Sequence, residues 1–421
     1  MVTPTPATAE LGRLVIERCD ALAALSERPG ELTRRFLTPS HRASIELVAG
    51  WMREAGMATR LDAAGTLIGR YDGDGRESRP LLVGSHLDTV CNGGRYDGML
   101  GVVAAIACVD QLKRAGHRLA FPIEVPAFGD EEGARFGIAL IGSRAMAGTL
   151  PADWLGRRDG DGISLAEALA GFGLDPARLG EAARRPGDQL GYLELHIEQG
   201  PVLEAEGLPL GVVTGICGAT RAEVVFAGRS GHAGTVPMAA RHDALAGAAE
   251  FVLAAESIAQ ASAGAVLATV GRIGAEPGAA NVIAGRCGVT LDVRAPTDPA
   301  RRAAVARILE SARAIAARRG LEVSIDVFYD ADAAPCDPAL TADVAASLAA
   351  RGIVVRSLAS GAGHDGMALA AVMPYGMIFM RCAGGISHHP AEAITAEDAA
   401  EGTAALLDLL YRLDHRLGRN P

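Results

Sequence analysis

Three features of the sequence predict an α/β fold. The chain has 421 residues, which is more than one ordinary core holds, so we expect two domains. Hydrophobic residues make up 49% of the chain and aromatic residues only 4%, a balance typical of layered α/β packing. Short apolar runs also alternate with segments of helical spacing, as expected where helices cover a sheet.

The N-terminal half predicts helices and strands in turn. Apolar residues recur at helical spacing over 9–27, and 81–84 is a short apolar run that ends at glycine, typical of a buried strand. The remaining elements expected here are a helix at 40–55, a hairpin strand at 67–71, a helix at 99–115, a strand at 123–128, a helical and polar surface stretch at 150–190, and a strand at 193–198.

The pattern changes near residue 212. The elements expected after it are strands at 212–216, 222–226, 265–273, 287–293 and 323–327, and helices at 239–257 and 298–318. This order predicts a compact α/β insert with one antiparallel sheet. A helix at 338–351 and strands at 352–356 and 377–379 are expected to rejoin the first part. We therefore predict a larger domain of residues 1–211 and 330–421, interrupted by a smaller domain of residues 212–329.

Composition argues against several classes of protein. The net charge of -10 argues against a nucleic-acid-binding protein, because such proteins carry clusters of positive charge. The seven cysteines are odd in number and lack CxxC spacing, which argues against a disulfide framework or a structural zinc ribbon. No apolar run reaches the roughly 20 residues of a membrane span, and an acid as early as Glu10 does not fit a signal peptide. We expect a cytoplasmic protein without membrane partners.

Residues that ligate metals gather at predicted strand ends and in glycine-bearing loops. They are His86 with Asp88, Asp97, the pair Glu131 and Glu132, His196, and the doublet His388 and His389. Each has an ordinary alternative, such as a hydrogen-bonded strand-end histidine, a capping aspartate, a solvated acidic turn or a satisfied core histidine. Five such coincidences in one chain are improbable together, so the sequence predicts a metal centre.

The chemistry of these residue types suggests their division of labour. A metal-bound imidazole needs its second nitrogen held, and Asp88 is close enough to His86 for that task. Of two adjacent carboxylates, one can bind a metal while its neighbour takes a proton from water. Glycine-rich phosphate loops are absent, and Ser143 and Ser230 lack a GxSxG context, so nucleotide binding and serine catalysis are weaker hypotheses.

In combination these blocks resemble the M20-type di-metal amidohydrolases, specifically the hydantoinase/carbamoylase branch. That branch contains N-carbamoyl-L-amino-acid hydrolases, β-ureidopropionases and allantoate amidohydrolases, and the likeness runs from about residue 10 to 415. The resemblance implies two divalent metal ions per subunit. The residues it assigns are His86 and His196 to one ion, Glu132 and His388 to the other, Asp97 as the bridge, Glu131 as general base and Asp88 as the partner of His86.

Two features favour the ureido-cleaving branch of that family. The position of His196 is usually a carboxylate in the peptidase and deacetylase branches, and their spacing between the first histidine and the bridging aspartate is much longer than that from His86 to Asp97. The His388–His389 doublet leaves open which imidazole binds, and the family register favours His388.

Further residues resemble the family's substrate contacts. His232 lies in a block similar to the loop whose histidine stabilises the oxyanion. Asn281 and Arg294 resemble contacts to a substrate carboxylate, for which an arginine fork is well suited. Gln199 and His364 are expected to contribute further polar contacts.

The resemblance implies hydrolysis of a ureido C–N bond in a small carboxylate substrate, with N-carbamoyl-L-amino acids and allantoate as equal candidates. Zinc is the first expectation for the metal, and manganese, cobalt and nickel fit the same ligands. The insert is expected to close over the site and to form a homodimer. Two alternatives stay open: an aminoacylase or dipeptidase on the same centre, and a non-catalytic metal-dependent binding protein.

Overall fold

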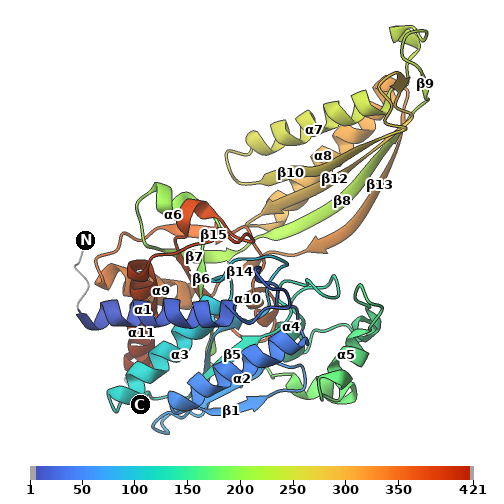
Figure 1. Cartoon of the computed structure of the whole chain (residues 1–421). Coiled ribbons are helices and arrows are strands. Elements are labelled where there is room, and N and C mark those ends of the chain that lie inside the picture. The colour runs from blue at the N-terminus through green and yellow to red at the C-terminus, as the bar shows by residue number, and fades with distance from the viewer. Residues whose placement is uncertain (1–5, 418–421) are drawn as a thin grey trace. The chain divides into compact units, whose positions relative to one another are not determined.

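The described chain forms two compact units. The structure is a computed structural model that describes residues 6–417, so residues 1–5 and 418–421 of the predicted larger domain lie outside the described residues. Unit 1 comprises the chain up to Thr214, Cys336–Leu358 and the chain from Ala362 onward; unit 2 comprises Gly215–Pro335 and Ala359–Gly361. Helices and strands alternate in both, which confirms the predicted α/β class (Figure 1).

The largest sheet has ten strands. Its order is β1 (Ala58–Leu61), β2 (Leu67–Tyr71), β5 (Ile123–Phe128), β3 (Leu81–Val83), β6 (Gly191–Ile197), β16 (Tyr375–Met380), β7 (Leu210–Ile216) and β14 (Ala334–Pro335), with β4 (Ser85–His86) on β5 and β15 (Ser357–Ser360) on β7. β3 pairs in parallel with β5 and β6, β4 with β5, and β16 with β6. The carboxyl ends of these five strands therefore meet at one edge of the sheet.

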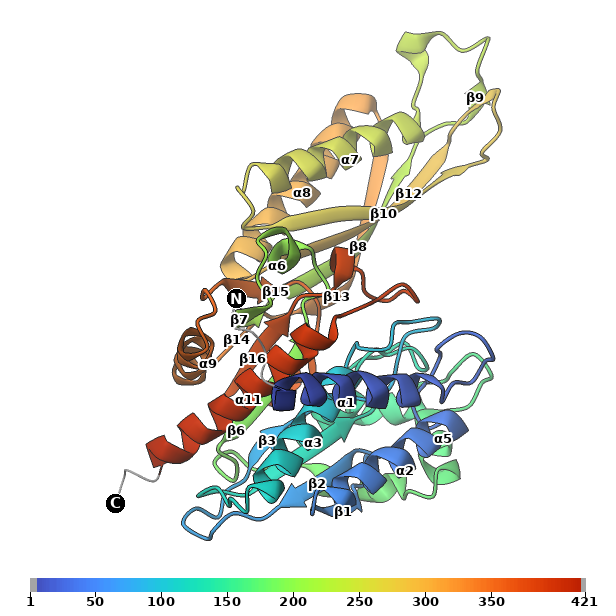
Figure 2. The same cartoon turned by 60° about the vertical axis from the view of Figure 1, so that its left-hand side comes forward.

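Helices cover this sheet. The helices of unit 1 are α1 (Pro6–Ala23), α2 (Pro39–Glu54), α3 (Met99–Arg114), α4 (Ile141–Met146), α5 (Leu165–Gly171), α6 (Val202–Ala205), α9 (Pro338–Ala350), α10 (Asp365–Leu369) and α11 (Ala396–Leu417). α3 contacts β4, β5 and β6, and it also packs beside α1 and α11 (Figure 2). Because α3 is apolar on all sides over its first eleven residues, it is buried within this layer and anchors the loop before it.

Unit 2 contains one antiparallel sheet of four strands. Its order is β10 (Leu267–Glu276), β12 (Arg286–Ala295), β8 (Gly218–Ala227) and β13 (Glu322–Ala331), with α7 (Ala244–Gln260) and α8 (Asp298–Arg319) packed on it. Burial alternates along β8 and β12, so one face of the sheet forms a core with the helices. A separate short ribbon pairs β9 (Gly231–His232) with β11 (Val282–Ile283).

Three expected elements differ from the structure. The predicted strand at 352–356 is irregular, because Val354 and Val355 are exposed and β15 begins only at Ser357. The helix predicted at 239–257 begins at Ala244, where Asp243 caps it by accepting backbone hydrogen bonds. The stretch 150–190 holds only short pieces, namely η1 (Ala152–Gly156), α5 and η2 (Pro176–Ala182). Among the helices of residues 6–417, none is long and apolar enough to cross a membrane.

Candidate metal centre

The predicted ligands of the N-terminal half lie at the carboxyl ends of parallel strands. His86 is the last residue of β4, and His196 is the penultimate residue of β6. His86 lies opposite Phe128, the last residue of β5, so the turn that carries Glu131 starts at the same edge of the sheet. Open α/β sheets bind ligands at this edge because the loops that follow the strands converge there.

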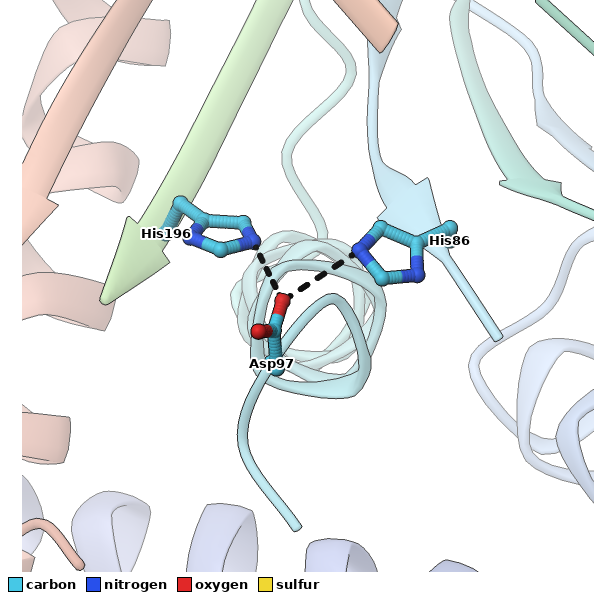
Figure 3. A group of neighbouring side chains, drawn as sticks. All are labelled: His86, Asp97 and His196. Carbon is cyan, nitrogen blue, oxygen red and sulfur yellow. Dashed lines mark ion pairs between the residues drawn. The ribbon is translucent and has the colours of Figure 1, made fainter. Parts of the chain in front are cut away.

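Asp97 lies between the two strand-end histidines (Figure 3). Its Oδ1 is 3.5 Å from Nε2 of His86 and 3.1 Å from Nε2 of His196. Its Oδ2 is 3.3 Å from Nε2 of His388. One carboxylate therefore faces three imidazoles, two on one oxygen and one on the other, which is the geometry a bridging carboxylate requires.

Gly98 allows the Asp97 loop to lie this close. Its φ is +73°, and a Cβ at this position would overlap the ring of His86. Its backbone N–H donates a hydrogen bond of 3.3 Å to Nε2 of His196. A side chain at residue 98 would meet both the left-handed backbone and the imidazole, so the loop requires glycine here.

Backbone carbonyls orient the two buried imidazoles. Nδ1 of His86 is 3.0 Å from the carbonyl oxygen of Asp88, and Nδ1 of His196 is 2.9 Å from that of Ile197. Because each Nδ1 is held by a carbonyl oxygen, Nε2 is the ring nitrogen that each histidine turns toward Asp97. Asp88 is thus beside His86 as predicted, but the short contact comes from its backbone carbonyl, since its carboxylate Oδ1 is 3.6 Å away.

The Asp88 carboxylate instead shapes the acidic turn. Its Oδ1 accepts the backbone N–H of Glu131 and its Oδ2 that of Glu132, both at 3.1 Å. The two glutamates of this turn face different histidines. Glu132 Oε2 lies 3.4 Å from Nε2 of His388, whereas Glu131 Oε2 lies 3.9 Å from Nε2 of His86. Adjacent carboxylates are therefore held in different positions of one cluster.

The structure distinguishes the two histidines of the C-terminal doublet. His388 has a φ of +56°, and its Nε2 lies between the carboxylates of Asp97 and Glu132. His389 is exposed, and its Nδ1 accepts the backbone N–H of Ala391 at 3.1 Å. Only His388 therefore has its imidazole in the cluster.

Burial and mutual charge shift the pKa values of the cluster. Burial opposes the charged form of Asp97, but hydrogen bonds from the three imidazoles outweigh it and hold its pKa well below the ordinary value. Burial raises the pKa of Glu131 well above its ordinary value and that of Glu132 to about 7. The hydrogen bond to Asp97 raises the pKa of His388 to about 9.

The donor set fits a divalent cation. The groups of three side chains whose ligand atoms lie within 4.8 Å of one another are His86–Asp97–His196, His86–Glu131–Glu132, Asp97–Glu132–His388 and Glu194–His196–His364. Glu132 Oε1 is buried and has no hydrogen-bond partner among residues 6–417. Buried polar atoms are almost always paired, so this oxygen is available to a cation. Imidazole and carboxylate together suit zinc, manganese, cobalt and nickel.

Two predicted substrate contacts lie beside this cluster. Gln199 has a φ of +56°, and its Nε2 donates hydrogen bonds to Asp97 Oδ2 at 2.8 Å and to Ser387 Oγ at 3.2 Å. His364 is buried, and its ring centroid is 4.4 Å from that of His196 in an edge-to-face arrangement. Gln199 and His364 are thus part of the same polar cluster.

The other predicted contacts belong to unit 2. His232 pairs with Val282 in the β9–β11 ribbon, next to Asn281, whose carbonyl accepts the N–H of Ala233 at 2.9 Å. Arg294 lies on β12, and its guanidinium binds Asp292 through Nε at 2.9 Å and Nη2 at 3.1 Å. Within unit 2 the fold therefore brings His232 and Asn281 together, while Arg294 has a carboxylate partner of its own.

Sequence reasoning missed several residues of the cluster. Glu392 and Ser387 contact the Asp97 loop, and nothing in the local pattern distinguishes them from ordinary loop residues. Glu194 accepts the hydroxyl of Ser85 at 2.7 Å and shares a cation-sized group with His196. For Glu194 a signal was present, because side chains alternate along a strand and residue 194 shares a face with residue 196.

Fold and site together are those of a metal-dependent hydrolase of the α/β class. The chain belongs to peptidase family M20/M25/M40, whose model matches residues 82–412, and within it to the hydantoinase/carbamoylase branch. The family predicted from the sequence is thereby confirmed.

Named relatives agree with this assignment. An N-carbamoyl-L-amino acid amidohydrolase of Geobacillus stearothermophilus is 43% identical over 403 residues, which cover 96% of this chain and 98% of that protein. An allantoate deiminase of Arabidopsis thaliana is 40% identical over 425 residues, covering 94% of this chain and 81% of that protein. The crystal structure of a hydantoinase/carbamoylase family amidase from Burkholderia multivorans matches with a TM-score of 0.89 and 35% identity, over 95% of this chain and 97% of that one.

Proposed function

We propose that this chain hydrolyses the ureido C–N bond of a small carboxylate substrate, either an N-carbamoyl-L-amino acid or allantoate. One observation carries the proposal. Glu131 and Glu132 leave a turn held by Asp88 and face different histidines, since Glu132 lies 3.4 Å from His388 and Glu131 lies 3.9 Å from His86. One carboxylate can then serve as ligand and its neighbour as base.

In this proposal the cluster holds two divalent ions. Zinc is the first expectation, and manganese, cobalt or nickel are the alternatives. The residues that would hold them are His86 and His196 for one ion, Glu132 and His388 for the other, and Asp97 for both. When bound, such ions polarise a carbonyl group and lower the pKa of water. The fit of imidazole and carboxylate donors supports the assignment.

Glu131 performs the proton transfers. It takes a proton from the attacking water and returns it to the nitrogen that leaves the ureido carbon. The family likeness assigns His232 to the oxyanion, where a donor stabilises the charge that develops on the carbonyl oxygen. Water adds across the C–N bond, and a carbamoyl substrate would yield the amino acid, ammonia and carbon dioxide.

The predicted substrate contacts have different roles in this proposal. Gln199 and His364 would contact the ureido end, since both lie in the cluster of unit 1. Asn281 and Arg294 would bind the carboxylate of the substrate. A substrate carboxylate would share the Arg294 fork with Asp292, which occupies it now.

Unit 1 would be the catalytic domain, and unit 2 the lid and the dimerisation domain of a homodimer. α7 exposes Leu253 at 65%, and the edge strand β10 exposes Leu267 at 61% and Ile273 at 49%. Exposed apolar side chains on a helix and on an open sheet edge are typical of a surface that a second copy covers.

A substrate panel tests the proposed function. Protein reconstituted with zinc or manganese is assayed for ammonia release from allantoate and from several N-carbamoyl-L-amino acids, and for amino acid release from the matching N-acetyl compounds. Ureido cleavage with little N-acetyl cleavage is expected. Preference for the N-acetyl compounds would favour an aminoacylase and contradict the proposal. No turnover of any amide by metal-loaded protein would favour a non-catalytic binding protein.

A further inference from the structure

Glu392 is a buried carboxylate that holds the loop of Asp97. Its Oε1 accepts the backbone N–H of Tyr96 at 2.8 Å and that of Asp97 at 3.1 Å, although 295 residues separate Glu392 from Asp97. A Cβ on Gly94 would overlap the carboxyl group of Glu392. The loop is therefore built around this carboxyl group, with glycine where the two approach most closely.

Ser387 connects the second oxygen of Glu392 to the carboxylate of Asp97. Its Oγ lies 3.1 Å from Glu392 Oε2 and 2.8 Å from Asp97 Oδ2. Gln199 donates to the same Asp97 oxygen at 2.8 Å. The contacts of Gln199 and Ser387 with Oδ2, together with the fixed backbone, hold the Asp97 carboxylate in the rotation in which Oδ2 faces His388.

We propose that Glu392 is a positioning residue for Asp97. Acting through the backbone and through Ser387, it sets the plane of the Asp97 carboxylate so that each oxygen faces a different group of imidazoles. The inference rests on the proposed role of Asp97 as the ligand shared by two ions. A carboxylate free to rotate would not keep one oxygen on each group of imidazoles. Groups that orient a ligand in this way contribute strongly to metal affinity.

Proton counting shows which substitution preserves this role. The hydroxyl of Ser387 has one proton and lies between two carboxyl groups. A glutamine at 392 can keep its oxygen on the two backbone N–H groups while its amide N–H donates to Ser387 Oγ, which then donates to Asp97. Glu392→Gln therefore preserves the positioning, whereas Glu392→Ala removes it.

Asp62 provides a matched control. It is buried, and its Oδ1 accepts the backbone N–H groups of Ala64 and Thr66, each at 2.9 Å. Asp62→Ala thus removes a buried carboxylate with two backbone hydrogen bonds, as Glu392→Ala does, but from a turn that belongs to none of the cation-sized groups among the described residues. It separates loss of stability from loss of positioning.

The test measures Zn²⁺ binding without substrate. Metal-free wild type, Glu392→Ala, Glu392→Gln, Ser387→Ala and Asp62→Ala are titrated with Zn²⁺ against a chromophoric chelator, and with Co²⁺ to record the visible spectrum, after circular dichroism has established folding. Glu392→Ala should bind Zn²⁺ about 10- to 100-fold more weakly with an altered Co²⁺ spectrum, and Ser387→Ala should weaken binding in the same direction. The Zn²⁺ affinity of Glu392→Gln should stay within about threefold of that of the wild type, and the affinity of Asp62→Ala should equal that of the wild type.

Folded Glu392→Ala with wild-type Zn²⁺ affinity and spectrum would overturn the inference, and so would Glu392→Gln as weak as Glu392→Ala. If Glu392→Ala does not fold, Ser387→Ala decides, and wild-type binding by that variant overturns it. Wild-type protein that binds Zn²⁺ but cleaves no ureido substrate would contradict the proposed function and leave this inference standing.

Discussion

The carboxylate of Asp88 accepts the backbone N–H of Glu131 at 3.1 Å, across 43 residues of sequence. Its second oxygen holds Glu132 in the same way, so one buried aspartate aims both members of the acidic pair. Because burial of Asp88 is complete, this hydrogen bonding has no competition from solvent. The orientation of Glu131, the proposed base, thus depends on Asp88 in the loop after β4 and not only on the turn that contains Glu131.

Asp88→Asn should lower kcat for the ureido substrate by about 10- to 100-fold. The amide N–H₂ of asparagine would face a backbone N–H where the carboxylate oxygen accepted one, and the turn would shift. Steady-state kinetics measure the effect, with bound zinc determined in parallel. An unchanged kcat in a folded, zinc-loaded variant would contradict the role of Asp88 in aiming Glu131.

Glu131→Gln should lower kcat by about 10²- to 10⁴-fold while zinc content stays at the wild-type level, because the amide keeps the shape of the side chain but cannot take a proton. Glu132→Gln is the matched contrast and should lose zinc. Kinetics and metal analysis of both purified variants make the comparison. Undiminished hydrolysis by zinc-loaded Glu131→Gln would show that another group is the base.

His388→Ala should lose most of the bound zinc, and His389→Ala should retain it. The reason is geometric, since only the imidazole of His388 lies between Asp97 and Glu132. Zinc per subunit, measured after dialysis against metal-free buffer, gives the answer. The reverse order of effects would assign the ligand to His389.

Asp62 should make the stability of the wild type depend on pH. Burial raises its pKa in the folded protein from 3.8 to about 6. The folded state therefore holds this proton over a range where the unfolded state has lost it, so stability falls as pH rises from about 4 to about 6. Above that range the ionised, buried carboxylate costs on the order of 2–3 kcal/mol.

Asp62→Asn cannot ionise and keeps an oxygen for the two backbone N–H groups of the turn. Its stability relative to wild type should therefore increase between pH 4 and pH 6 and then level off. Urea unfolding of both proteins at a series of pH values measures the difference. A difference that stays constant across this range would contradict the raised pKa.

The sequence predicted where the proposed strand-end ligands lie, because their positions follow from local pattern. Short apolar runs end just before His86 and Glu131, and parallel strands must bring such ends together. Val354 and Val355 show the limit of that reasoning. Their strand propensity is strong, but no neighbouring strand pairs with them in the described chain, so the segment stays irregular.

Partners distant in sequence could not be predicted in the same way. The contacts of Glu392 with the Asp97 loop depend on how the C-terminal segment returns to the sheet, which no local pattern encodes. Similarly, the hydrogen bond between Ser387 and Asp97 joins residues that are 290 positions apart in the chain. Residue types indicated the chemistry, whereas tertiary structure assigned the neighbours.

Unit 2 interrupts the chain between His196 and His388, yet both histidines belong to unit 1. The interruption is bridged by the sheet, because β16 pairs in parallel with β6 and places Phe379 opposite His196. A backbone cut anywhere in unit 2 would consequently produce two fragments, of which the first carries four of the proposed ligands and the second carries His388. A bound ion coordinated by both fragments would then stabilise their association, although the N-terminal and C-terminal fragments would no longer share a covalent backbone.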